Sequence, residues 1–155
     1  MGMIYTASFE NISITAAQDL FELLTPADAA IVLHEIGFEQ SSDIDSEQLR
    51  FSLNRVTGAP TSGSGGGTVT PTPAIPGAAA AGSVVERNNT TRLSGGTSVS
   101  LLPGGFNVLE GRRFVWTPET RPEIAPSTRL VMGLETAPAD AITGQGWLIF
   151  EEVGG

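Results

Sequence analysis

Hydrophobic and polar residues alternate with a period of two along much of the chain, which is the pattern of half-buried β-strands. Residues 3–15 begin the pattern, and Tyr5 and Phe9 belong to its apolar positions. The alternation recurs over residues 30–40 and again over residues 49–56, with a short polar segment between them. Two such runs joined by a polar turn predict a β-hairpin.

One stretch of the first half is ambiguous. The leucines and the phenylalanine of residues 16–24 fit one face of a short helix as well as a bent strand. From residue 83 onward the alternation returns in short runs, separated by turns rich in glycine and proline. Short strands at intervals of about 8–12 residues are typical of all-β sandwiches and barrels. We therefore expect an antiparallel β-sandwich of the jelly-roll kind, with an extended N-terminal strand.

Residues 58–82 interrupt this pattern. They carry no charge and consist mainly of glycine, proline, alanine, threonine and serine. Residues 63–67 have the composition of a flexible linker, and the prolines at 71 and 73 favour an extended conformation. Such a stretch buries little apolar surface to offset its ordering entropy, which favours a disordered loop; the alternative is an arm that orders against a partner. We expect a single domain over residues 1–155, with 58–82 as a linker or arm between its two strand-rich halves.

Composition and charge narrow the classes of function. The chain has 155 residues, no cysteine and a net charge of −9, and its eight positive charges are all arginines. Without clustered positive charge, binding to nucleic acid is not expected. Neither an apolar run long enough to cross a membrane nor a secretory signal is present in the sequence, so we expect synthesis in the cytoplasm.

Candidate catalytic and metal-binding residues are few. His34 is the only histidine, and no Gly-x-Ser-x-Gly motif accompanies it, so we do not expect an enzyme. Asp43, Asp45 and Glu47 alternate as oxygen ligands for a cation would. An EF-hand loop needs glycine at its sixth position and glutamate at its twelfth, where this chain has glutamine and asparagine. We therefore expect neither a metal nor a cofactor.

A basic and aromatic cluster, Arg112-Arg113-Phe114-x-Trp116, is the clearest candidate for recognition. It could stack on single-stranded nucleic acid, but the acidic net charge argues against that. Arginine and tryptophan dominate the energetics of protein interfaces, whereas packing of the aromatic rings in the core is the simpler alternative. The residues expected at an interface are Tyr5, Phe9, Arg112, Arg113, Phe114, Trp116 and Trp147.

Several segments together resemble a family of small all-β proteins found among the structural genes of tailed bacteriophages and prophages. They are YTASFEN at residues 5–11, TAAQDLFEL at 15–23, QSSD at 40–43, TSGSGG at 61–66, NNTT at 88–91 and FEEVGG at 150–155. The resemblance spans the chain and contributes no catalytic residue.

This resemblance implies a component of the virion. We expect a decoration or cement protein on the outer surface of the phage head, a homotrimer that bridges subunits of the major capsid protein. A component of the tail, baseplate or head–tail connector is the first alternative. The second is a carbohydrate-binding module of a host-recognition structure, in which Trp116 or Trp147 stacks on sugar rings.

Overall fold

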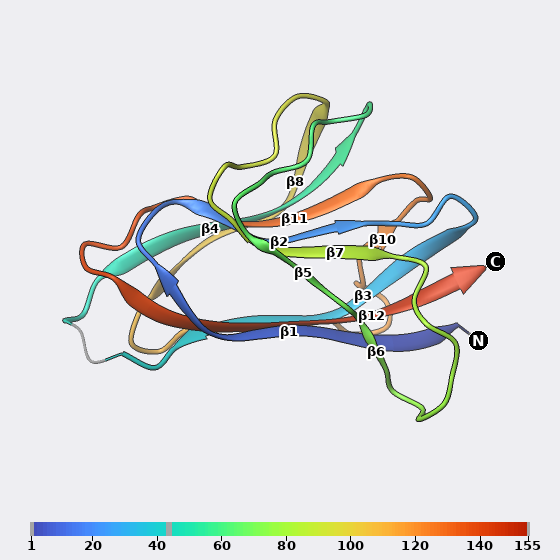
Figure 1. Ribbon diagram of the computed structural model, residues 1–155, viewed down its shortest axis with the longest axis horizontal. Coiled ribbons are helices and arrows are strands. Elements are labelled where there is room, and N and C mark those ends of the chain that lie inside the picture. The colour runs from blue at the N-terminus through green and yellow to red at the C-terminus, as the bar shows by residue number, and fades with distance from the viewer. Residues whose placement is uncertain (1, 43–44, 155) are drawn as a thin grey trace.

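The computed structural model describes residues 2–42 and 45–154. They form two antiparallel sheets that face each other and do not close into a barrel (Figure 1). Sheet A has the strand order β10-β3-β12-β1-β6, with β9 also paired to β3, and sheet B has the order β5-β7-β2-β11-β4-β8. The strands are β1 (Met3–Ile14), β2 (Gln18–Leu24), β3 (Ala29–Gln40), β4 (Gln48–Thr57), β5 (Gly67–Val69), β6 (Thr72–Pro73), β7 (Val84–Asn89), β8 (Thr97–Asn107), β9 (Arg112–Val115), β10 (Glu123–Ile124), β11 (Arg129–Leu134) and β12 (Ile142–Gly154).

Eight of these strands pair in the order of a jelly roll. Strand β1 pairs with β12, β2 with β11, β3 with β9, and β4 with β8. Counted along the chain, the first strand therefore pairs with the eighth, the second with the seventh, the third with the sixth and the fourth with the fifth. A long hairpin rolled into two sheets has this arrangement. The expected antiparallel β-sandwich of the jelly-roll kind is confirmed.

The core lies between the two sheets and is built from the apolar positions of the alternating pattern. Phe38 and Phe150 of sheet A and Phe21 and Leu53 of sheet B are each no more than 2% exposed. Full burial of side chains of this size stabilises a fold by about 1.5–3 kcal/mol each. The ambiguous residues 16–24 contribute a strand, β2, which is buried on both faces.

Residues 58–82 join the edges of both sheets. Strand β5 extends sheet B through β7, and β6 pairs with β1 at the edge of sheet A. Their glycines allow close approach of backbone to backbone: a Cβ atom at Gly66 would lie 2.0 Å from the Arg87 carbonyl oxygen. The structure therefore differs from the expected disordered loop, because these residues gain backbone pairing in place of apolar burial.

The chain on either side of β5 to β7 forms a flap over the outer face of sheet B. Residues 58–66 and 90–96 run side by side, and Thr61 pairs with Ser94 and Ser64 with Thr91 through four backbone hydrogen bonds of 2.9–3.1 Å. We call these two segments the flap. They explain why β2 is buried on both faces.

Candidate interaction surface

Apolar side chains lie on the outer face of sheet A, where an antiparallel sheet usually presents polar residues to water. Val115 is 63% exposed and Ile4 is 37% exposed. The strand registers place these residues in adjoining rows across β1, β12, β3 and β9. We call this surface the outer patch, and it consists of Ile4, Thr6, Glu35, Gly37, Arg113, Val115, Trp147 and Ile149.

The indole ring of Trp147 lies flat across the neighbouring strand. Gly37 is the register partner of Trp147, and a Cβ atom at Gly37 would lie 2.1–2.6 Å from three atoms of the ring. The indole nitrogen donates a 2.6 Å hydrogen bond to the Glu35 carboxylate. One face of the ring therefore packs on the glycine, and the side chain remains partly exposed at the surface.

Glu35 also binds Arg113, which reaches across from β9. The guanidinium donates two hydrogen bonds, of 2.7 and 3.0 Å, to the two oxygens of this carboxylate. The Arg113 guanidinium lowers the pKa of Glu35, and the Trp147 hydrogen bond acts in the same direction against the opposing effect of burial. Glu35 thus fixes the position of an arginine and a tryptophan, the two side chains most enriched in interface hot spots.

A second polar pair lies on the same face of sheet A. The imidazole of His34 is 3.2 Å from the Glu151 carboxylate, which also accepts a 2.7 Å hydrogen bond from the backbone N–H of Gly2. The charged groups at the centre of this face are therefore paired within the chain. Charged residues are depleted in the cores of protein interfaces. Here each charged group already has a partner within the chain, so a protein partner can cover this face without leaving a charge unpaired.

We expect Gly37→Ala to displace the Trp147 ring from the sheet. In a Trp116→Phe background, Trp147 is the sole tryptophan, so its fluorescence emission should shift to longer wavelength as the ring enters water. Gly105→Ala is the matched control, because its added Cβ would meet one backbone oxygen at an ordinary distance of 3.5 Å. Unchanged emission for Gly37→Ala would contradict the packing described above.

Two residues expected at an interface lie inside the sandwich instead. Tyr5 is 2% exposed and stacks on Phe150, and Phe9 is 6% exposed and packs on Phe21. Both point inward from β1 because they occupy the apolar positions of its alternation. This burial corrects the prediction that Tyr5 and Phe9 form a contact surface.

The basic and aromatic cluster of residues 112–116 is divided between the two faces of β9. The rings of Phe114 and Trp116 stack on one another at 6.2 Å and pack against the core. Arg112 is exposed, with its guanidinium 4.7 Å from the centre of the Phe114 ring. Among the residues expected at an interface, the structure therefore brings only Arg113 and Trp147 together in the outer patch.

Glu35, Gly37 and Val115 belong to the outer patch and were not singled out in the sequence. The alternation of β3 places Glu35 and Gly37 on one face, so the sequence pattern indicates that these two residues share a surface. The contact between Glu35 and Arg113 has no sequence signal, because 78 positions separate the two residues.

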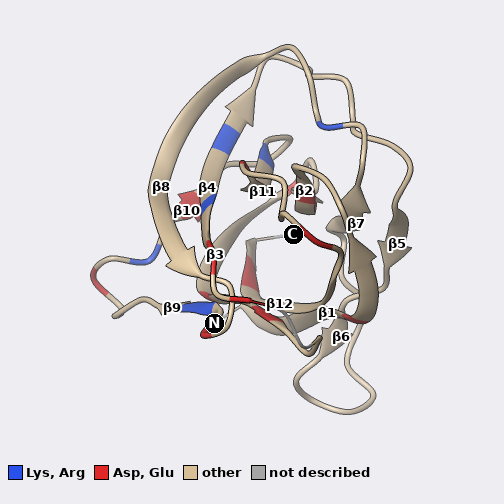
Figure 2. Ribbon diagram, turned by 90° about the vertical axis from the view of Figure 1, so that its left-hand side faces the viewer, with Lys and Arg blue, Asp and Glu red and all other residues tan. Residues whose placement is uncertain are grey.

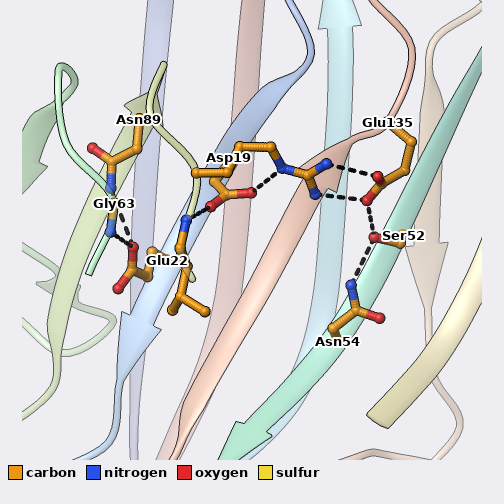
Figure 3. Close-up of polar contacts among 9 residues, drawn as sticks. Asp19, Glu22, Ser52, Asn54, Gly63, Asn89 and Glu135 are labelled. Carbon is orange, nitrogen blue, oxygen red and sulfur yellow. Dashed lines mark hydrogen bonds and ion pairs between the residues drawn. The ribbon is translucent and has the colours of Figure 1, made fainter. Parts of the chain in front are cut away.

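A second polar cluster ties the flap to the outer face of sheet B (Figure 3). Asp19 of β2 is 1% exposed and accepts 2.7 and 2.9 Å hydrogen bonds from the Leu93 N–H and the Arg92 guanidinium. Arg92 also donates two 2.7 Å hydrogen bonds to Glu135. Burial raises the pKa of Asp19, whereas the hydrogen bonds from Arg92 lower the pKa of Glu135.

Glu22 holds the other half of the flap. Its carboxylate accepts hydrogen bonds from the Gly63 N–H at 2.9 Å and the Ser62 hydroxyl at 2.7 Å, and it pairs with Arg129 of β11. Glu22 is 1% exposed. Together, the carboxylates of β2 bind backbone donors from both segments of the flap and hold the flap on sheet B.

A shallow groove of about 530 Å³ follows β4 and β8 on the outer face of sheet B. Ser52, Asn54 and Glu135 line it, and they already bond to one another, since Asn54 donates to Ser52 and Ser52 to Glu135. The groove therefore continues the polar cluster that holds the flap.

The acidic turn considered as a cation site is only partly described. Asp43 lies outside the described residues, and Glu47 accepts hydrogen bonds of 3.1 and 3.2 Å from the Ala139 N–H. Within residues 2–42 and 45–154, no group of three histidine, cysteine or acidic residues is placed to hold a metal ion. The same residues include no helix of the length and hydropathy that a membrane span requires.

Comparison with known proteins adds no relative. No family model, no curated protein and no solved structure matches the chain.

Proposed function

We propose that the chain is a structural protein of a tailed-phage virion, a decoration protein that docks on the major capsid protein through the outer patch. The observation that carries the proposal is the outer patch itself, in which Glu35 holds both Trp147 and Arg113 in place. Its setting in a phage head rests on the sequence resemblance. Jelly rolls occur in capsid proteins and in lectins, so the fold alone does not choose between these functions.

The geometry makes the outer patch a preformed binding surface. Side chains that are already fixed lose less conformational entropy on binding, and Trp147 and Arg113 are fixed by the same carboxylate. The apolar area around them, from Ile4 to Val115, runs across four strands and is suited to a broad and nearly flat contact.

Copy number separates this proposal from a role in the head–tail connector, which needs far fewer copies than a protein that covers the shell. Trp116 and Trp147 are both partly exposed, so the carbohydrate-binding alternative rests on both rings, although Trp116 stacks on Phe114 and packs against the core. Trp147 lies beside the ion pair of Glu35 and Arg113, and this setting suits a hot spot of a protein interface at least as well as a ring that stacks on a sugar.

The binding test uses two exposed positions. Val115 in the outer patch is 63% exposed, and Leu109 in the turn between β8 and β9 is 52% exposed. We expect Val115→Glu to weaken binding to expanded phage heads by about tenfold or more, the equivalent of about 1.4 kcal/mol, because a carboxylate would enter the contact unpaired. Leu109→Glu adds the same charge elsewhere and should bind like the unaltered protein.

The assay is cosedimentation of the purified chain with heads that lack it. Equal binding of the unaltered protein and Val115→Glu would exclude the outer patch as the docking surface. No binding of the unaltered protein at any salt concentration would exclude the decoration function.

A further inference from the structure

The four edges of the two sheets are unequal. Sheet A ends in β6 on one side and in β9 and β10 on the other, and sheet B ends in β5 on one side. These four edge strands are two to four residues long. The remaining edge is β8, which has 11 residues. Natural proteins usually keep edge strands short, because a long one presents a row of unpaired backbone groups to other chains.

Strand β8 also lacks the charges that normally protect an edge. Its residues 97–107 include no acid and no arginine, although the whole chain has 25 charged residues (17 acidic and 8 basic). Figure 2 shows β8 without charge at the left-hand side of the molecule, beside the arginines of β4. Residues 97–100 are all exposed, and Val99 is 44% exposed.

We propose that β8 is a self-association edge, through which two copies of this chain pair antiparallel about a twofold axis. The pairing joins the two B sheets into one continuous sheet and leaves the outer patch of sheet A uncovered. It uses residues 97–101, because Pro103 has no N–H to donate. With the axis at Val99, the two exposed valines lie opposite each other, where directly paired side chains have Cβ atoms about 4.5–5.5 Å apart.

A second copy is the occupant that the charges favour. Each chain has a net charge of −9, and β8 allows two chains to meet without bringing acidic groups together. The nearest like charge in the row of Val99 is Arg55 of β4, its register partner. Three strand spacings of about 4.8 Å would separate Arg55 from its copy, about 14 Å. This distance exceeds the Debye length of about 8 Å at physiological ionic strength, so their repulsion is screened.

This geometry predicts a dimer in place of the trimer expected from the sequence. The test is sedimentation equilibrium of the full chain, up to roughly 1 mM, where even a dimer with a Kd of about 1 mM is detected. We expect a monomer–dimer equilibrium for the unaltered protein. Val99→Lys should abolish dimer formation, because it places two positive charges opposite each other on the twofold axis.

Val115→Lys is the matched control, since it introduces the same change on the exposed surface of sheet A. It should dimerise like the unaltered protein and lose binding to phage heads, whereas Val99→Lys should stay monomeric. If Val99→Lys does not fold by circular dichroism, Ser98→Lys replaces it at a neighbouring exposed position. An unaltered protein that remains monomeric or forms a trimer would overturn the proposal, as would dimers of both folded lysine variants.

Discussion

Arg92→Met should destabilise the protein by about 3 kcal/mol, because it leaves the buried Asp19 carboxylate without its charged partner. Removing one member of a buried pair costs about 3–5 kcal/mol. The lower end applies here because the Arg92 side chain is 34% exposed and Asp19 keeps the hydrogen bond from the Leu93 N–H. The free energy of unfolding, measured by urea denaturation at pH 7, checks this expectation.

The pH dependence of this deficit follows from the two carboxylates. Burial raises the pKa of Asp19 in the folded state, so its charge opposes folding as the pH rises through that raised value. Without Arg92 this pKa should rise further. The hydrogen bonds from Arg92 lower the pKa of Glu135, so their stabilisation is present above the ordinary pKa of glutamate and is lost on acidification. The Asp19 effect predicts that the deficit of Arg92→Met shrinks between pH 7 and pH 4, and the Glu135 effect adds to this decrease only below the ordinary glutamate pKa of 4.5.

Two further variants test the cause. Asp19→Asn removes the buried charge and should restore part of the stability lost in Arg92→Met. Arg113→Met breaks an ion pair of similar geometry at a side chain that is 61% exposed, so its effect on stability should be far smaller. Equal losses of unfolding free energy for Arg92→Met and Arg113→Met would show that burial does not determine how much the ion pair of Arg92 stabilises the protein.

Gly66→Ala should detach the flap from sheet B. The new Cβ atom would lie 2.0 Å from the Arg87 carbonyl oxygen, and this oxygen belongs to the paired backbone of β7. Inserting a methyl group into close-packed structure costs about 1–3 kcal/mol, and we expect the upper end because backbone must move. Since the basic residues are all arginines, trypsin provides the assay, and cleavage after Arg87 and Arg92 should accelerate.

Gly67→Ala is the control from the adjacent glycine. Its Cβ atom would meet the movable guanidinium of Arg87 at 3.3 Å, so trypsin cleavage should remain close to that of the unaltered protein. Slow cleavage of Gly66→Ala would contradict the close packing of the flap and would restore the interpretation of residues 63–67 as a flexible linker.

The sequence predicts the fold class because the period of two marks which side chains face the core. Tyr5, Phe9 and Leu53 all occupy apolar positions of that alternation and are all buried. Residues 16–24 remained ambiguous because β2 is covered by the core on one face and by the flap on the other. A strand buried on both faces loses its alternation, and a short apolar run of that kind also fits a helix.

The composition of residues 58–82 fits two opposite structures. Glycine is the residue of flexible linkers, and it is also the residue that permits contact between two backbones. The contact at Gly66 depends on Arg87, which lies 21 positions further along the chain and acquires its position only from β7. Composition therefore could not distinguish flexibility from close packing.

The outer patch was predictable in part. Arg113 and Trp147 stood out as residue types that dominate interfaces, and the structure places them on one carboxylate. The same reasoning predicts Tyr5 and Phe9 at an interface, and both are buried, because an aromatic residue suits a core as well as an interface. The polar cluster around Asp19 and Glu22 had no signal, since its donors belong to loops distant in sequence.

The central claim is that this chain decorates a phage head, and stoichiometry tests it most directly. Under the proposed function a phage or prophage encodes this chain, and the measurement is the molar ratio of the chain to the major capsid protein in purified virions of that phage. The account predicts a ratio near one copy per capsid subunit, which is also the ratio that one dimer at each twofold contact between two capsid subunits gives. A molar ratio of a few per cent would contradict it and would indicate a component of the tail or the connector.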